Sequence, residues 1–213
     1  MARYFVLHKP AGCITARRDH RARPTVYDHV PAPWRDVPHV GRLDQGTEGL
    51  LLFTDDGRLA QAVLNPGFAG LADPTAVPPL EKVYHVKVRG VLPPDDPVLA
   101  LLEHPLRYPD GVETRPARVR WLAPRARATW LEVAITEGRN RQVRLLCGRS
   151  GLQVVKLRRV AVGPLRLGDL PARWCRPLEE AEVAALYAAV LPADPRPPLD
   201  PLPDPGGAQD FQA

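Results

Sequence analysis

The sequence predicts an α+β domain with a largely antiparallel sheet. Strand-like and helix-like segments follow one another without the regular alternation that indicates a parallel sheet. Residues 50–53 form an apolar run that is too short for a helix and is flanked by glycines, which is typical of a buried strand. Residues 82–89 alternate apolar and polar side chains, as a half-buried strand does. A chain of 213 residues can bury one sizeable core, or two small lobes that share one.

The N-terminal part is expected to hold two strands and one helix. Residues 3–8 are predicted as the first strand, and residues 9–40 as mostly loop, because prolines interrupt them repeatedly. After the buried strand, apolar spacing in residues 57–65 predicts a helix. The stretch up to Pro79, rich in Pro, Gly and Ala, is expected to be a loop.

The C-terminal part is expected to contain four strands and three helices. The predicted strands cover residues 82–89, 117–122, 129–136 and 152–162. The predicted helices cover residues 95–103, 140–149 and 178–191. Asn140 is the expected N-cap of the second of these helices, and three glutamates complement the dipole at the start of the third.

Composition separates the chain into a body and a tail. Residues 1–191 are predicted as one domain, with two lobes that share one sheet. Residues 192–213 hold seven prolines within fourteen positions and carry a net charge of −3. Such a segment cannot bury enough apolar surface to offset its ordering entropy, so we expect the tail to be disordered.

Composition also excludes several classes of protein. No apolar run is long enough to span a membrane, and no signal-peptide pattern opens the chain. Three widely spaced cysteines argue against a disulfide framework and a zinc site, and the six histidines show no metal-ligand spacing. Glycine-rich nucleotide-binding motifs are lacking as well. We therefore expect a cytoplasmic monomer without cofactor, metal or membrane partner.

Positive charge is segregated along the chain. The net charge is +5, which leaves +8 on residues 1–191 once the acidic tail is set apart. Residues 137–176 alone hold ten Lys or Arg against two acids, and a second basic run covers residues 17–23. Clustered cations are typical of a polyanion-binding protein, because each one placed at a phosphate releases a counterion. A solvated basic surface is the alternative interpretation of the charge taken by itself.

One carboxylate occupies a position that suits chemistry. Asp44 lies on a glycine-bounded turn beside Arg42, directly before the buried strand. A rigid strand fixes the geometry of such a turn while the turn itself exposes the side chain. An aspartate that merely caps a turn is the structural alternative.

Residues 41–57, GRLDQGTEGLLLFTDDG, resemble the GRLD-x-x-T-x-G-LLL-x-T-x-DG motif of pseudouridine synthases. Three further matches follow the family order. Residues 8–12 resemble the Asn-Lys-Pro-x-Gly turn of RsuA-type enzymes, with His8 in place of Asn. Lys82 and Tyr84 match its Lys-x-Tyr strand, and residues 137–144 match Glu-Gly-Arg-Asn-Arg-Gln-Val-Arg in full. The resemblance spans residues 3–190.

This resemblance implies a fold, a reaction and a class of substrate. The fold would be a central sheet with outer helices and a catalytic cleft across its middle. The reaction would be the isomerisation of uridine to pseudouridine in RNA. The core motifs begin within the first ten residues, which leaves no room for an N-terminal RNA-binding S4 domain and resembles the minimal RluE-like members that act on large-subunit (23S) ribosomal RNA. A transfer-RNA or small-subunit uridine, and a catalytically idle RNA-binding or ribosome-assembly factor, are the alternatives.

The family motifs also imply roles for individual residues. Asp44 would act at the ribose, either by attacking C1′ or by removing a ribose proton to give a glycal. Arg144 would pair with Asp44 and keep it ionised. Tyr84 would stack on the target base and take the C5 proton, and Arg42 would fill the gap that the extruded base leaves. The isomerisation is redox-neutral and free of hydrolysis, so no cofactor is implied.

Of the remaining basic residues of the motifs, Arg139 or Arg141 is expected to contact an RNA phosphate, and Lys9 and Lys82 are expected to make phosphate or fold contacts. With Arg42, the predicted RNA-binding residues are Lys9, Lys82, Arg139 and Arg141.

Overall fold

A computed structural model describes residues 2–65, 79–191 and 202–203. Its strands are β1 (Tyr4–Lys9), β2 (His39–Val40), β3 (Glu48–Thr54), β4 (Lys82–Arg89), β5 (Arg118–Arg125), β6 (Ala128–Ile135), β7 (Val154–Val162), β8 (Leu165–Arg166) and β9 (Cys175–Pro177). Its α-helices are α1 (Gly57–Leu64), α2 (Val98–Glu103), α3 (Gln142–Arg149) and α4 (Glu180–Val190). Two short 3-10 helices, η1 (Val26–His29) and η2 (Ala32–Trp34), lie between β1 and β2.

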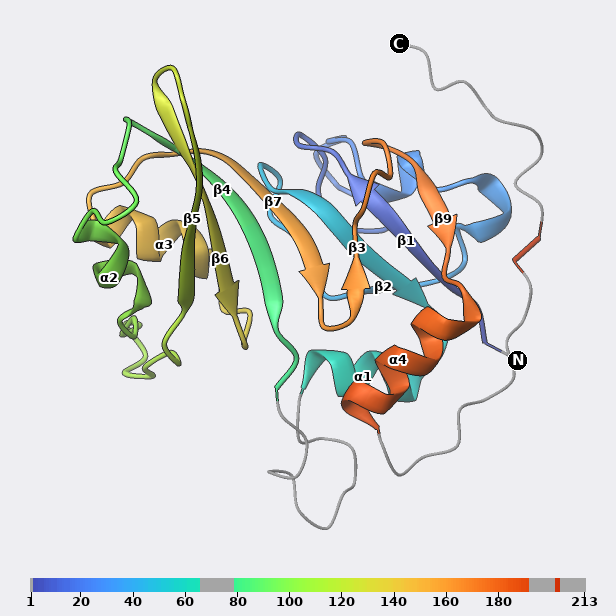
Figure 1. The fold of residues 1–213 in the computed structure, drawn as a ribbon. Coiled ribbons are helices and arrows are strands. Elements are labelled where there is room, and N and C mark those ends of the chain that lie inside the picture. Colours follow the sequence, from blue (N-terminus) through green and yellow to red (C-terminus); the bar gives the residue numbers. More distant parts are fainter. Residues whose placement is uncertain (1, 66–78, 192–201, 204–213) are drawn as a thin grey trace.

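The described strands form one open sheet in the order β5-β6-β4-β7-β3-β1-β9, with β2 paired to β3 and β8 to β7 (Figure 1). Every pairing is antiparallel except that of β3 with β7. This parallel contact is short, with Glu48 opposite Arg158 and Gly49 opposite Arg159. It joins the half of the sheet made by β5, β6, β4 and β7 to the half made by β3, β1 and β9.

Gly49 makes the close approach at this junction possible. Its φ is +111°, and a Cβ atom added there would lie 2.1 Å from the carbonyl oxygen of Arg159. Only a residue without a side chain fits both the backbone conformation and the space. The glycine of the motif therefore allows the two halves of the sheet to meet.

Each half of the sheet has its own core. In the first half, apolar residues of α2 and α3 pack on the side of β4 that carries Tyr84 and Val86. In the second half, β1 and β3 are buried on both faces. One face packs under α1 and α4, and the other packs under the η1–η2 region. This arrangement confirms the predicted α+β fold with a mostly antiparallel central sheet and flanking helices.

A buried polar cluster ties the two helices of the second half to the sheet. The Asp56 carboxylate caps α1 by accepting from the backbone N–H of Leu59 at 3.0 Å. Its other oxygen accepts hydrogen bonds from the hydroxyls of Tyr4, at 2.8 Å, and Tyr187 of α4. One carboxylate therefore satisfies three donors that packing removes from water.

Several predictions differ from the structure in detail. Residues 9–40 are mostly loop, as predicted, but also contain the short elements η1, η2 and β2. Strands β8 and β9 were not predicted, because they are too short to give a strand pattern. The predicted loop at 66–78 and most of the predicted tail at 192–213 lie outside the described residues. Among the described helices, none has the length and apolar character that crossing a bilayer requires.

Candidate active site

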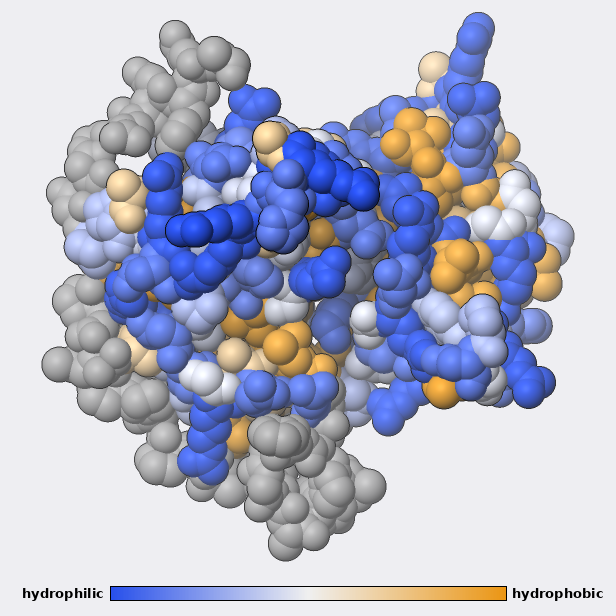
Figure 2. Space-filling view, turned by 180° about the vertical axis from the view of Figure 1, so that it is seen from behind, coloured by the Kyte–Doolittle hydropathy of each residue, from blue (hydrophilic) through white to orange (hydrophobic). Residues whose placement is uncertain are grey.

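A cavity of about 360 Å³ lies where the two halves of the sheet meet. It is lined by residues 40–44 and Thr47 of the β2–β3 connection, Lys82 and Tyr84 of β4, residues 138–143 before and within α3, and Leu157 and Arg159 of β7. Figure 2, which shows the molecule from behind, shows the surface hollowed between the two halves, with hydrophilic residues around the hollow. Motifs that lie far apart in the sequence thus converge on one site.

Asp44 lies half-buried at this cavity, on a turn that hydrogen bonds to its backbone hold in place. The turn is closed by a hydrogen bond of 3.0 Å from the N–H of Thr47 to the carbonyl of Asp44. From the N-terminal loop, the hydroxyl of Thr15 donates to the carbonyl of Leu43 at 2.8 Å. The N–H of Gly12 donates to the carbonyl of Gln45 at 2.8 Å. The backbone that carries the carboxylate is therefore fixed before any ligand arrives.

Lys9 holds the same turn from β1. Its side chain is fully buried, and its ammonium donates to the carbonyls of Pro10, Asp44, Gln45 and Thr47 at 3.0, 3.1, 3.4 and 2.9 Å. Burial lowers the pKa of Lys9, an effect opposed by nearby charges that include Asp44. An ammonium that is buried in this way cannot reach a phosphate, so of the two roles predicted for Lys9 the structure shows the contact within the fold.

Arg144 contributes differently from the prediction. No ion pair joins Arg144 to Asp44 within 4.0 Å in the described part of the chain. Its Nη2 instead donates to the carbonyl of Gly46 at 2.8 Å, and Arg144 does not line the cavity. The predicted pair is therefore not formed in this structure. Arg144 ties α3 to the turn that carries Asp44.

Tyr84 and Lys82 lie beside each other on the cavity face of β4. Tyr84 is 7% exposed and presents an aromatic wall to the cavity. Burial and, to a smaller extent, the positive charge of Arg159 lower the pKa of Lys82 to about 8, whereas Glu137 opposes the shift. Lys82 therefore supplies a cation to the cavity at neutral pH and loses it in mildly alkaline solution.

Three predicted RNA-binding arginines line the same cavity. Arg42 is exposed and also borders a second hollow of about 410 Å³, which the segment from Ile14 to Arg23 helps to line. Arg139 forms an ion pair with Asp110, and Arg141 is exposed on the connection into α3. Asp44 borders both hollows, so RNA could approach it from either side of its turn.

Arg141, rather than Asn140, occupies the N-cap position of α3. Its φ is +52°, a left-handed conformation that costs a residue with a side chain about 1–2 kcal/mol. The predicted N-cap is therefore wrong by one residue. The sequence could not indicate Arg141, because no sequence pattern predicts an arginine in the left-handed conformation. Backbone strain of this kind is often found at functional sites, and this strain lies at the cavity rim.

Two further residues line the cavity, although no sequence pattern indicated that Arg159 is functional and the motif indicated only a turn-shaping role for Thr47. Arg159 is 5% exposed; its Nε donates to the carbonyl of Leu50 at 2.9 Å, and it lines the cavity opposite Tyr84 in the β4–β7 register. Thr47 lines the cavity as well, and its buried hydroxyl has no hydrogen-bond partner among the described residues. The alternation of β7 would have indicated Arg159 only if the strand register had been known.

Comparisons with known proteins agree with this geometry. A family model described as RNA pseudouridylate synthase matches residues 3–148. The chain is 40% identical over 182 residues to ribosomal large subunit pseudouridine synthase E of Xanthomonas axonopodis pv. citri, covering 78% of this chain and 88% of the relative. It is 36% identical over 188 residues to ribosomal large subunit pseudouridine synthase B of Bacillus subtilis, covering 87% and 71%.

Similarity extends to a small-subunit relative and to a solved structure. The chain is 34% identical over 188 residues to ribosomal small subunit pseudouridine synthase A of Pseudomonas aeruginosa, covering 87% of this chain and 74% of the relative. A crystal structure described as pseudouridylate synthase superposes with a TM-score of 0.70 at 29% identity, covering 87% of this chain and 74% of the other.

Proposed function

The chain belongs to the RNA pseudouridylate synthase family, and we propose that it converts a uridine of large-subunit ribosomal RNA into pseudouridine through Asp44. As a member of this family it is an isomerase that acts on RNA. Its motifs are those of the RsuA type, and its similarity to ribosomal large subunit pseudouridine synthase E, 40% identity with 88% of that relative covered, supports an RluE-like member. The choice of large-subunit RNA and the roles of individual residues are the proposal.

The reaction balances without an external reagent. The bond between N1 of the base and C1′ of the ribose breaks, the base rotates within the site, and a bond forms between C5 and C1′. The proton on C5 is lost and N1 gains one. Breaking the glycosidic bond develops positive charge at C1′, and a carboxylate can stabilise or trap this charge as it does in glycoside hydrolysis. Asp44 fills this role by attack at C1′ or by removal of a ribose proton.

The observation that supports this assignment best is the fixed backbone of Asp44 at a cavity with an aromatic wall. Asp44 is held from β1, from the N-terminal loop and from α3. Tyr84 faces the same cavity, in a position suited to stack on a uracil and to accept the C5 proton. Lys82 supplies positive charge at the same cavity for a phosphate next to the target. A single carboxylate is sufficient because no water has to be activated.

The target uridine has to leave its stack before Asp44 can reach its ribose. Extrusion of a nucleotide costs about a few kcal/mol, which groups that stack on the base or fill the gap can offset. Arg42 lies exposed beside Asp44 and is the candidate for filling the gap. The cations Arg139 and Arg141 at the rim are the candidates for contacts with the backbone of the surrounding RNA.

Relatives of both substrate classes are similar to this chain, but identity favours the large subunit. The large-subunit relative at 40% identity is also 88% covered by this chain, whereas the small-subunit relative is 34% identical. A small-subunit uridine is therefore the second candidate. A cytoplasmic monomer stays our prediction for the protein in the cell.

Site-resolved mapping of pseudouridine in RNA from cells with and without this protein tests the proposal. We expect the loss of one signal in large-subunit RNA. Loss of a signal in small-subunit RNA would replace the proposed substrate with the second candidate. An unchanged map of ribosomal RNA in cells that contain folded protein would contradict both.

A further inference from the structure

The sheet has a second face, opposite the cavity, that carries a basic and aromatic surface. Helix α3 packs on the cavity side of β4 and lies behind β5 and β6 in Figure 1. The alternate side chains of the same strands point the other way, and the paired registers place them on one surface. We call this surface the open face; it consists of Arg120, Trp130, Glu132, His85, Lys87, Arg89, Lys156 and Arg158.

One row of the open face puts two lysines beside an indole. Lys87 of β4 lies directly opposite Trp130 of β6 on one side and Lys156 of β7 on the other. Like charges placed directly opposite each other destabilise a sheet. The Nζ of Lys156 forms an ion pair with the carboxylate of Glu48 at 3.0 Å, but Lys87 has no ion-pair partner among the described residues. This row therefore offers positive charge that the described protein leaves unneutralised.

The carboxylates near the neighbouring row are shared between several partners. Glu132 contacts Arg120 at 3.1 Å and His85 at 3.5 Å. Across the β3–β7 junction, the carboxylate of Glu48 forms an ion pair with Arg158 at 3.5 Å and another with Lys156 of the first row. The side chain of Arg158 is 36% exposed, and its Nε has no hydrogen-bond partner in the described part of the chain. Glu48 is thus shared by two cations, and Glu132 by Arg120 and the ring of His85. The lysines and arginines of the open face outnumber these two carboxylates, so the face keeps a net positive charge.

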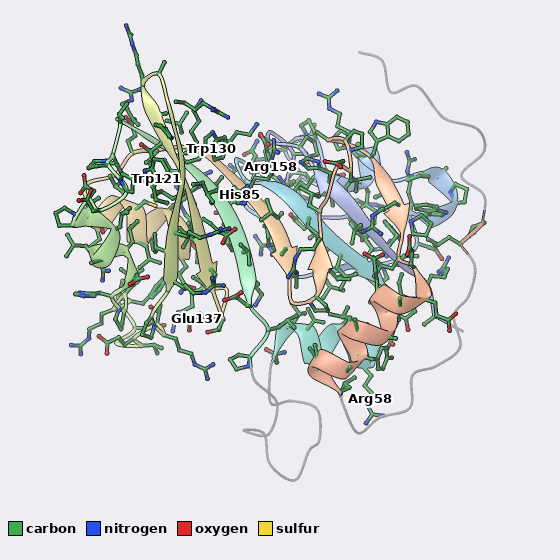
Figure 3. The ribbon with its side chains drawn as sticks, in the orientation of Figure 1. Arg58, His85, Trp121, Trp130, Glu137 and Arg158 are labelled. Atoms are coloured by element: carbon green, nitrogen blue, oxygen red, sulfur yellow. The ribbon has the colours of Figure 1, made fainter. Side chains whose placement is uncertain are left out.

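Trp130 gives this charged surface a flat aromatic group. Figure 3 shows Trp130, His85 and Arg158 on the neighbouring strands β6, β4 and β7. Trp130 is half-buried, and its indole N–H has no partner among the described residues. Sheets that bind single-stranded RNA combine these two elements, because bases stack on aromatic side chains while cations contact the phosphates.

We propose that the open face binds a single-stranded segment of the substrate RNA, with phosphates at Lys87 and Lys156 and a base stacked on Trp130. This inference rests on the proposed function, because that function makes RNA the partner. It adds a contact surface on the side of the sheet opposite the catalytic cavity. A target uridine in the cavity and a flanking strand on the open face would then be held by the same protein.

Binding of a fluorescent oligouridylate of about 20 nucleotides, measured over a range of salt concentrations, tests this inference. We expect Lys87→Ala with Lys156→Ala to lower the slope of log affinity against log salt by about 1.4, since each phosphate contact in a single strand contributes about 0.7. Trp130→Ala should weaken binding about tenfold, whereas Trp130→Phe should keep most of it. The matched control is Arg107→Ala, which removes an exposed cation outside the open face and should leave the slope unchanged.

Photocrosslinking with the same oligonucleotide carrying 4-thiouridine identifies the surface directly. A crosslinked peptide from β6 that contains Trp130 is expected, in the wild-type chain and in the Asp44→Asn chain alike. Because both chains are measured for binding alone, a failure of pseudouridine formation would contradict the proposed function without changing this result. An unchanged salt slope in the double lysine variant, or crosslinks confined to cavity residues, would overturn the inference.

Discussion

Replacing Lys9 by Met tests whether the turn that carries Asp44 is fixed from beneath by a buried cation. The substitution removes the ammonium and keeps an unbranched apolar side chain in the same space. Of the four carbonyls that lose this donor, two keep another. Asp44 still accepts from the N–H of Thr47 and Gln45 from that of Gly12. The carbonyl of Thr47 keeps no donor among the described residues, and that of Pro10 keeps only the thiol of Cys13 at 3.6 Å.

The size of the effect follows from these two carbonyls. A buried polar group left without a partner costs about 1–3 kcal/mol, which gives about 2–6 kcal/mol for the pair. Burial of the ammonium has a desolvation cost of its own, visible in the lowered pKa of Lys9, and removing the charge recovers part of it. We therefore expect Lys9→Met to lower the free energy of unfolding by about 2–4 kcal/mol. A displacement of the carboxylate by about 1 Å would lower the rate of pseudouridine formation about a hundredfold.

Urea unfolding and single-turnover pseudouridine formation measure the two effects. Lys87→Met is the matched control for stability, because that lysine is half-buried without an ion-pair partner in the described structure, and its loss should change the free energy of unfolding by less than about 0.5 kcal/mol. If Lys9 were a phosphate ligand instead, Lys9→Met would leave stability unchanged and lower the salt slope of RNA binding by about 0.7. That pattern would refute the structural role of Lys9.

Three further predictions concern the junction, the helix cap and the cavity. Gly49→Ala should destabilise the protein by about 2–4 kcal/mol in urea unfolding, because its Cβ would meet the backbone of Arg159 at a positive φ; a loss below 1 kcal/mol would contradict the close approach. Asp56→Ala should cost about 3 kcal/mol, since it removes a helix cap and the carboxylate acceptor of two buried hydroxyls, and a thermal melt unchanged from wild type would argue against this cluster. RNA affinity at constant ionic strength should fall as the pH rises through about 8, where Lys82 loses its proton and so its charge; Lys82→Arg should abolish this dependence, and its persistence in that variant would assign the titration elsewhere.

The sequence motifs correctly predicted which residues lie together at the cavity. Asp44, Arg42, Tyr84 and Lys82 come from two separate motifs, and the structure brings all four to one cavity. Short glycine-flanked and alternating segments also predicted the central strands, because these patterns follow directly from burial on two faces or on one. The sheet order was not available from the sequence, since the β3–β7 contact joins residues about a hundred positions apart.

The environment of the charged residues could not be predicted in the same way. Lys9 belongs to a strand whose six residues are all buried, so alternation gives no sign of where its side chain ends. The sequence therefore left phosphate and fold contacts open for this lysine, and the structure surrounds its ammonium with four backbone carbonyls. Arg144 was predicted to contact the carboxylate of Asp44, but its guanidinium contacts the carbonyl two residues further along the same turn. A motif fixes which elements meet and leaves individual hydrogen-bond partners open.

The measurement that tests the central claim most directly compares the purified wild-type chain with Asp44→Asn on unmodified ribosomal RNA transcripts. Pseudouridine is quantified at each position, and RNA binding is measured for both proteins. We expect the wild-type chain to form pseudouridine at a specific position in the large-subunit transcript, and Asp44→Asn to form none while it keeps its RNA affinity. Pseudouridine formed by Asp44→Asn at the wild-type rate would contradict the assignment of Asp44 as the residue that acts at the ribose.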